Sequence, residues 1–133
     1  MASGLHQHPR LLFFLRYWLP LIGYVGLIFT LSAQPHLQTP LRFDNSDKLI
    51  HASEYGGLGV LLLAMLRASN PSRVAIVSAM MAVAAGMCIA AIDENFQRTV
   101  PGRMCDFTDW IADSSGLVLA QLAALVWSRI REN

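Results

Sequence analysis

The feature that most constrains this chain is an uncharged segment of 19 residues from Val74 to Ile92. A helix needs roughly 20 apolar residues to cross the hydrocarbon core of a bilayer. Three further segments are similarly apolar: residues 11–33, a segment that begins near Asp47 and is uncharged from Tyr55 to Leu66, and residues 111–127. Because backbone polar groups must be satisfied internally in lipid, each is expected to be helical. The sequence therefore predicts an all-α polytopic membrane protein, a compact bundle of four transmembrane helices.

The composition agrees with lipid as the solvent. Charged residues make up 14% and apolar residues 54% of the chain, whereas soluble domains carry about a quarter charged residues. No linker, low-complexity segment or internal repeat is visible, so residues 1–133 are expected to form a single domain. There is no basic stripe or nucleic-acid-binding motif, so we expect no nucleic-acid partner. Cys88 lies in an apolar run and Cys105 in a polar connection, which predicts two free thiols.

The first apolar segment has two possible interpretations. As a transmembrane helix, it contains Arg16 near its start, where the side chain can reach the interface, and Pro20 in its early part, where a missing N–H costs least. The alternative is a cleaved signal peptide, with residues 31–33 as a poor cleavage site.

Basic residues set the orientation of such a protein. Six basic residues lie on one side of the four spans and four on the other, which predicts both termini in the cytoplasm of a multi-pass cell-membrane protein. The inner set is Arg10, Arg16, Arg67, Arg73, Arg129 and Arg131, and the outer set is Arg42, Lys48, Arg98 and Arg103. Of the acidic residues, Glu132 alone falls inside. Acidic residues have little effect on the orientation of insertion. We therefore interpret the clustering of the other acidic residues on the outer side as functional.

Polar side chains share one face at the start of the second span. Asp47, His51 and Tyr55 are spaced by four residues, and Lys48 lies three before His51. A carboxylate beside a histidine fixes its tautomer, which suits a proton relay, a general base or a metal ligand. The alternative is an interfacial histidine capped by an aspartate at the helix start.

Two more acidic groups lie at the ends of the third and fourth spans. Asp93 and Glu94 can reach Gln97 or Arg98 on the same helix, so local neutralisation of one of the two carboxylates is the alternative to a functional role. Another polar face is formed by Arg103, Asp106, Asp109 and Asp113, at steps of three, three and four. Asp113 lies about a turn beyond Trp110 toward the lipid, so it needs a partner inside the bundle, and Arg103 and His51 are the candidates. A purely structural ion pair is the alternative.

Small residues four apart predict close helix approach. The pairs are Ala52 and Gly56, Ser53 and Gly57, and Ala82 and Gly86.

Three ordered blocks together resemble the VanZ-like membrane protein family over about residues 44–120. The blocks are Asp47-Lys48-x-x-His51-x-x-x-Tyr55, Asp93-Glu94-x-x-Gln97 and Pro101-Gly102-Arg103-x-x-Asp106-x-x-Asp109. The chain departs from the family at Asp113, where Asn is usual, but keeps Gly116. The resemblance implies an envelope role, since the family is named after a protein associated with low-level teicoplanin resistance. It does not imply that this chain confers resistance.

The residues and the resemblance together define a candidate site. Its members are Asp47, Lys48, His51, Tyr55, Asp93, Glu94, Gln97, Arg103, Asp106, Asp109 and Asp113. The first hypothesis is an envelope protein that binds a lipid-linked, anionic or glycopeptide-type molecule through Arg103 and Lys48, with membrane lipids as its surroundings. We assign no catalytic residue, metal or cofactor, and nothing indicates an oligomeric state.

Three alternatives remain open. One is a membrane-embedded hydrolase or transferase that uses His51 and nearby carboxylates, with or without a divalent cation. Ser53 lies two residues from His51 and therefore faces elsewhere on the helix, so it is not expected to act as its nucleophile. Proton movement is disfavoured because the inner halves of the spans lack ionisable residues. A polar cluster that only joins the helix ends is the last alternative.

Overall fold

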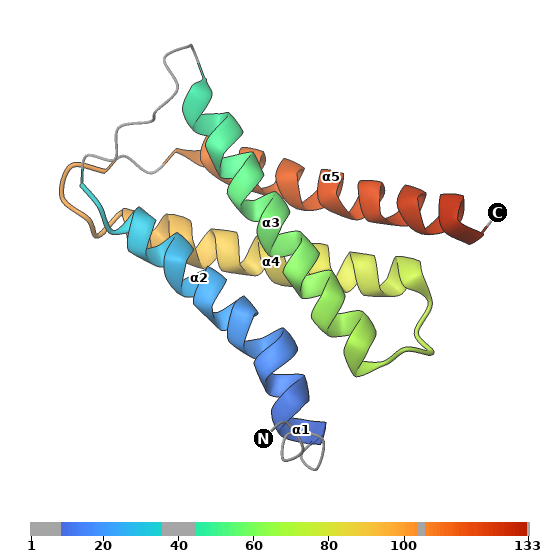
Figure 1. Ribbon diagram of the computed structural model, residues 1–133. Helices are drawn as coiled ribbons and strands as arrows, with labels where there is room; N and C mark the ends of the chain where they lie inside the picture. Colours follow the sequence, from blue (N-terminus) through green and yellow to red (C-terminus); the bar gives the residue numbers. More distant parts are fainter. Residues whose placement is uncertain (1–8, 36–44, 104–105, 133) are drawn as a thin grey trace.

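The computed structural model of the chain describes residues 9–35, 45–103 and 106–132 (Figure 1). Every regular element in these residues is a helix. The elements are α1 (Pro9–Phe13), the π-helical turn η2 (Phe14–Trp18), α2 (Leu19–Ser32), α3 (Ser46–Ser69), α4 (Ala75–Gln97) and α5 (Phe107–Glu132). α1, η2 and α2 follow one another without a break. Four helices result that are long and apolar enough to cross a membrane, which confirms the predicted all-α four-helix fold.

The helices include the polar residues beside their apolar runs, as predicted. α3 begins at Ser46, next to the predicted start near Asp47, and α5 begins at Phe107, four residues before the apolar run that starts at Ile111. The functional groups at these ends therefore lie on helices, whose geometry fixes their relative directions.

Pro20 lies near the middle of the first span, which runs for 24 residues from Pro9 to Ser32, and not in its early part as predicted. A proline ring clashes with the carbonyl four residues before it and donates no hydrogen bond. The π-helical turn directly precedes this position, and the Leu19 N–H bonds to the Phe14 carbonyl five residues back. The wider turn lets the helix continue through Pro20.

Successive helices run in opposite directions (Figure 1). α3 packs against both α5 and α4, and α4 also packs against α5. α2 is more peripheral, with only Leu21, Ile28 and Ser32 buried. The alternating directions bring the C-terminal ends of α2 and α4 to the same end of the bundle as the N-terminal ends of α3 and α5.

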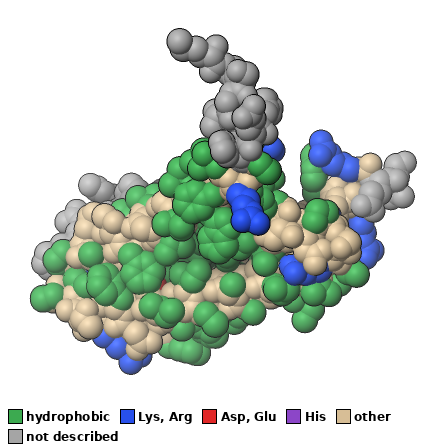
Figure 2. Space-filling model, turned by 90° about the horizontal axis from the view of Figure 1, so that it is seen from below, with side chains coloured by type: hydrophobic (Ala, Val, Ile, Leu, Met, Phe, Trp, Pro, Cys, Tyr) green, Lys and Arg blue, Asp and Glu red, His purple; other side chains and the backbone are tan. Residues whose placement is uncertain are grey.

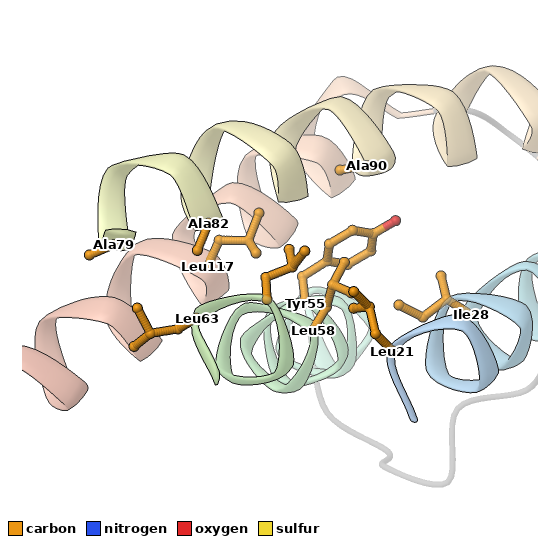
Figure 3. Packing of buried hydrophobic residues seen from close by; sticks show 10 residues of the cluster. Leu21, Ile28, Tyr55, Leu58, Leu63, Ala79, Ala82, Ala90 and Leu117 are labelled. Carbon is orange, nitrogen blue, oxygen red and sulfur yellow. The ribbon is translucent and has the colours of Figure 1, made fainter. Parts of the chain in front are cut away.

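A narrow core lies between the helices. The Tyr55 ring is fully buried beside Leu58, with Leu117 from α5 and Ala82 and Ala90 from α4 around them (Figure 3). Large apolar side chains also point outward on every span. On the face shown in Figure 2, hydrophobic side chains cover most of the surface and acidic side chains are almost absent. Such a surface is suited to lipid, so the chain is a multi-pass membrane protein.

Glycines allow α3 and α5 to pack with their backbones in contact. A Cβ on Gly116 would lie 2.0 Å from the Ala52 carbonyl oxygen, and a Cβ on Gly56 would lie 3.5 Å from the Gly116 carbonyl oxygen. A Cβ on Gly86 would overlap the Leu117 side chain. The predicted pairs Ala52 with Gly56 and Ala82 with Gly86 thus lie at helix contacts. In the third pair, Ser53 is exposed, but Gly57 packs against α2, where an added Cβ would overlap the Tyr24 hydroxyl. Gly116, the tightest position, had not been predicted to pack.

The thiols follow the prediction as far as they are described. Cys88 is free and exposed on α4, and Cys105 lies outside the described residues.

Candidate functional site

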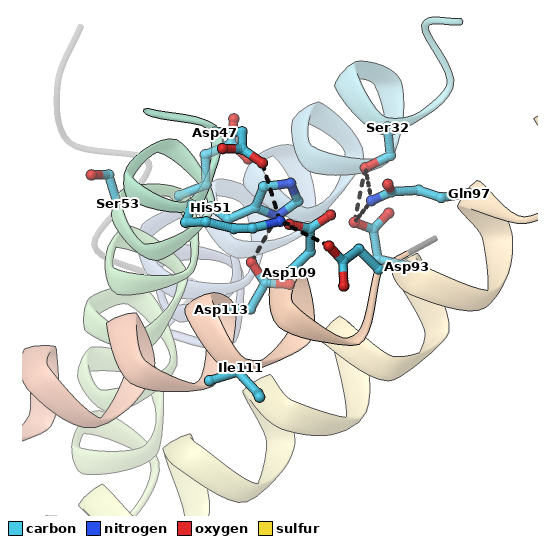
Figure 4. Close-up of polar contacts among 12 residues, drawn as sticks. Ser32, Asp47, His51, Ser53, Asp93, Gln97, Asp109, Ile111 and Asp113 are labelled. Carbon is cyan, nitrogen blue, oxygen red and sulfur yellow. Dashed lines mark hydrogen bonds and ion pairs between the residues drawn. The ribbon is translucent and has the colours of Figure 1, made fainter. Parts of the chain in front are cut away.

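The polar side chains of the candidate site gather at one end of the bundle (Figure 4). α3 supplies Asp47, Lys48 and His51, while α5 supplies Asp109 and Asp113. Tyr55 also lies on α3, Asp93, Glu94 and Gln97 lie at the C-terminal end of α4, and Arg103 and Asp106 lie between α4 and α5. Helices that are far apart in the sequence therefore contribute to a single group of contacts.

His51 and Asp113 form a pair at the contact between α3 and α5. The Nδ1 atom of His51 lies 2.9 Å from Oδ1 of Asp113, and the Asp113 side chain is only 2% exposed. The backbones of the two helices are in contact beside them, at Ala52 and Gly116. Because His51 adjoins Ala52 and Asp113 lies one turn before Gly116, the backbone contact brings the two side chains into hydrogen-bonding range.

Arg103 has a different role from the one expected. It had been a candidate partner for Asp113, but its Nε donates to the Ser32 carbonyl at 3.3 Å and its Nη2 to the Leu31 carbonyl at 3.2 Å. The last carbonyls of a helix lack intrahelical partners and carry partial negative charge. Arg103 therefore caps the C-terminus of α2, and His51 is the partner of Asp113.

Lys48 lies among three carboxylates. Its ammonium bonds closely to Asp109, and lies 3.1 Å from Oδ2 of Asp47 and 3.4 Å from Oδ2 of Asp106. The Lys48 side chain is one-quarter exposed, so this group lies at the rim of the bundle. The carboxylates exceed the cation in charge, which gives the rim a negative potential.

Asp106 also caps α5. Its Oδ1 accepts a hydrogen bond of 2.9 Å from the Thr108 N–H, which is the usual N-cap arrangement. This hydrogen bond, together with the Thr108 side chain and nearby Lys48, lowers the pKa of the exposed Asp106 carboxyl below its ordinary value. The cap explains why α5 starts where it does.

Asp93 is the centre of a second polar group, between α2 and α4. Its Oδ2 accepts hydrogen bonds from Ser32 Oγ at 2.8 Å and from Gln97 Nε2 at 3.1 Å. The contact with Gln97 agrees with the predicted local pairing on the third span. Ser32 was missed as a site residue, because a single serine at the end of an apolar span gives no signal by itself.

Two buried oxygens in this group have no hydrogen-bond partner among the described residues. They are the Tyr55 hydroxyl and Oδ1 of Asp93, in side chains that are 0% and 2% exposed. The hydroxyl lies beside Asp93, but without hydrogen-bond geometry. Buried polar groups are nearly always paired in folded proteins.

Glu94 faces away from the His51 pair. It lines a cavity of about 210 Å³ between α4 and α5 together with Asn95, Arg98, Phe107 and Trp110. Adjacent helical residues point about 100° apart, so Asp93 and Glu94 cannot both face the same group. The structure thus divides the predicted site into three parts. The first contains the His51–Asp113 pair and Lys48 with its carboxylates, the second is the group around Asp93, and the third is the cavity lined by Glu94.

Two observations limit the chemistry of the site. Ser53 bonds to the Leu49 carbonyl and points away from His51, as its position in the sequence predicted. In the part of the chain that the structure describes, no three His, Cys, Asp or Glu side chains are grouped as metal ligands.

These features define a class: an integral membrane protein of four spans with a polar cluster at one end. Within this class, the chain belongs to the VanZ/LLP1 family, whose family model matches residues 13–128. The match confirms the resemblance and extends it to most of the first span. That span also contributes Ser32 to the Asp93 group. Searches of curated proteins and of solved structures gave no match.

Proposed function

We propose that this VanZ-like protein acts in the cell envelope by binding the polar headgroup of a lipid-linked or anionic molecule at the outer membrane face. The observation that carries the proposal is the pair of buried oxygens of Tyr55 and Asp93 without hydrogen-bond partners among the described residues. Because the two oxygens lie beside each other in buried side chains, a headgroup with hydroxyl or amide groups would pair with both by inserting between them as the helix ends separate. An unpaired buried polar group costs about 1–3 kcal/mol, so ligand binding would recover that free energy.

Two cations, Arg103 and Lys48, would offset the negative potential of the rim where the anionic part of such a ligand binds. The two hydrogen bonds from Arg103 to the end of α2 use two of the five N–H donors of its guanidinium. The remaining donors lie at the membrane-interface end of the bundle, where a phosphate of a lipid-linked molecule would lie. Lys48 would contact the same anion by exchanging one of its three carboxylate partners.

Outward orientation of the cluster and a link to glycopeptide tolerance complete the proposal. Six basic residues against four favour cytoplasmic termini, which would put the cluster outside. A protein that holds a lipid-linked envelope precursor there would change the access of a drug such as teicoplanin to that precursor.

The test uses Tyr55→Phe, which removes one unpaired hydroxyl and keeps the buried ring. We expect purified wild-type protein to retain envelope lipids that mass spectrometry identifies, and to bind polyprenyl phosphate in detergent micelles. Tyr55→Phe and Arg103→Ala should each weaken this binding by about ten-fold, equivalent to about 1.4 kcal/mol. Ser53→Ala, whose hydroxyl points away from the cluster, serves as the control and should bind like the wild type.

The proposal is wrong if polyprenyl phosphate binds no better than a neutral lipid of equal chain length. It is also wrong if the double variant Tyr55→Phe, Arg103→Ala retains the same molecules as the wild type. Teicoplanin is tested in the same assay, because direct binding of the drug would identify it as the ligand in place of the precursor.

A second candidate function is supported by the His51–Asp113 pair. A carboxylate on Nδ1 orients the imidazole and leaves Nε2 to accept a proton from water or a hydroxyl, as in hydrolases and transferases. His51 is partly exposed, so a substrate can reach it. Ser53 points away from it, and water would be the nucleophile.

Turnover distinguishes this function from simple binding. Reconstituted protein would release inorganic phosphate from a polyprenyl diphosphate, and His51→Gln would lower the rate by at least about 100-fold. Equal rates for wild type and His51→Gln would leave only binding.

A further inference from the structure

A cavity of about 310 Å³ lies between α4 and α5, and it shares no lining residue with the Glu94 cavity. Its rim consists of exposed side chains and its floor of buried ones. The exposed lining residues are Ile76, Met80, Ala84, Val118 and Leu122, the partly buried ones are Val83, Met87 and Leu125, and the floor is Ala79 and Gln121. All of them belong to the apolar parts of the two spans, so the cavity opens toward lipid.

Gln121 is the one polar residue in the lining of this cavity, and it is only 3% exposed. Its Nε2 donates to the Gly59 carbonyl of α3 at 3.0 Å. Its Oε1 has no hydrogen-bond partner among the described residues. The two atoms diverge from one amide carbon, so Oε1 is directed away from α3 at the floor of the cavity. A buried acceptor without a donor is rare and unfavourable, which points to a donor from outside the chain.

The depth of Gln121 in the membrane limits what this donor can be. Asp113 and Arg129 are the nearest charged residues on α5, and each lies eight residues from Gln121. That spacing corresponds to about 12 Å in either direction at 1.5 Å per residue. Every lining residue is uncharged, so an ammonium here would have no counter-ion in the cavity and would be costly in hydrocarbon. The donor is therefore an uncharged group.

We propose that this cavity binds a neutral lipid whose hydroxyl donates a hydrogen bond to Oε1 of Gln121. One hydroxyl matches the one unpaired acceptor, and the hydrocarbon part of the lipid lies against the apolar walls. Oε1 is covered in this structure, and the flexible side chains of Met80 and Met87 are the walls that move aside to admit the hydroxyl. Long-chain or isoprenoid alcohols and hydroquinones with an apolar tail share this chemistry.

This site does not rest on the proposed function of the polar cluster. Tyr55, Asp93 and Arg103, which carry that function, do not line the cavity. Tyr55→Phe therefore separates the two proposals, because it should weaken ligand binding at the cluster and leave the binding of alcohols at Gln121 unchanged.

The experiment measures competition for labelling of the cavity by a photoactivatable alcohol. The full chain in detergent micelles is irradiated with hexadecanol that carries a diazirine in its chain, and mass spectrometry locates the labelled residues. The competitors are geranylgeraniol and its methyl ether, and a hydroquinone with an isoprenoid tail and its dimethyl ether. Each ether keeps the apolar part of its parent molecule but has no O–H to donate.

We expect labels on the lining residues of α4 and α5, such as Met80 and Leu122. A hydroxyl competitor should be about five-fold more effective than its ether, the effect of about one hydrogen bond. The pair with the larger ratio identifies the source of the hydroxyl, an aliphatic alcohol or a hydroquinone.

Three variants test the roles of the floor and the walls. Gln121→Leu should keep the labelling and reduce the ratio between alcohol and ether to near one. Ala84→Phe fills the cavity and should abolish the labelling. Ala64→Phe, on an exposed position of α3 that does not line the cavity, is the matched control and should label like the wild type.

Equal competition by the hydroxyl compounds and their ethers in the wild type would overturn the proposal, because Oε1 would then bind no donor. Equal labelling of Ala84→Phe and Ala64→Phe would overturn it too, since the alcohol would not occupy the cavity. A disulfide-linked dimer of Met80→Cys in native membranes, in a Cys88→Ala, Cys105→Ala background, would show that a second copy covers the cavity in place of a lipid. If Gln121→Leu fails to fold, Ala84→Phe and the wild-type ratio still decide the outcome.

Discussion

Gly116 and Ala52 are in backbone contact: a Cβ on Gly116 would lie 2.0 Å from the Ala52 carbonyl oxygen. This contact joins α3 to α5 directly beneath the candidate site. Ala52 adjoins His51, and Gly116 lies one helical turn after Asp113. The geometry of the His51–Asp113 pair therefore depends on a glycine that takes no part in the pair.

Gly116→Ala should strongly destabilise the protein, because backbone atoms cannot move aside as a flexible side chain can. We expect a loss of about 1–3 kcal/mol in the free energy of unfolding, measured by SDS titration in mixed micelles. Gly26→Ala on α2 is the matched control, since nothing lies within 4 Å of its added Cβ. It should be neutral or stabilise by up to about 1 kcal/mol through helix propensity. Equal effects of the two variants would show that α3 and α5 do not pack as described.

The His51–Asp113 pair should show coupling in a double-mutant cycle. Asp113→Leu leaves His51 without its partner and should cost about 3 kcal/mol of unfolding free energy, whereas His51→Leu with Asp113→Leu should cost less than the sum of the single changes. Asp113→Asn, the residue usual in the family, keeps a polar partner and should cost about 1 kcal/mol or less. Additive single effects would mean that the two side chains do not interact.

The spans were predictable from the sequence because each depends on a single local property, the length of an apolar run. The helical faces of Asp47, His51 and Tyr55, and of Asp106, Asp109 and Asp113, followed from local spacing in the same way. Contacts between helices could not be derived so directly. Asp113 had two candidate partners, and the choice of His51 over Arg103 depends on the Gly116–Ala52 packing.

Other parts of the site gave too little local signal. Ser32 and Tyr24 are single polar residues in an apolar span, yet Ser32 bonds to Asp93 and the Tyr24 hydroxyl donates to the Glu54 carbonyl at 2.9 Å. Arg103 lies just after a turn, and its contact with the end of α2 depends on how the loops close. The different directions of the Asp93 and Glu94 side chains could have been predicted from the sequence, because adjacent residues on a helix point about 100° apart.

Asp106 should stabilise the start of α5 in a pH-dependent way. Its pKa is lowered in the folded protein by the Thr108 N–H bond, so its contribution is complete above the ordinary aspartate value of about 3.9. The contribution is lost as the pH falls through the lower folded pKa. Asp106→Ala should therefore lower Tm at pH 7, with a difference from the wild type that shrinks below pH 4.

Asp106→Asn provides the control for that experiment. Asparagine caps helices about as well as aspartate but does not titrate, so its Tm difference from the wild type should be small at pH 7. A Tm difference for Asp106→Ala that stays constant from pH 7 to pH 3 would contradict the capping role of the carboxylate.

The orientation of the chain can be tested with single cysteines in the two turns that link described helices. Thr99 follows α4 near the polar cluster, and Ser72 lies in the turn between α3 and α4 at the opposite end; both are exposed. In a Cys88→Ala, Cys105→Ala background, we expect a membrane-impermeant maleimide to label Thr99→Cys on intact cells. Ser72→Cys should react only after the cells are opened, because the arginines that flank its turn favour the cytoplasm. The reverse pattern would put the polar cluster on the cytoplasmic side, where a ligand at the outer face of the membrane could not reach Arg103 or Lys48.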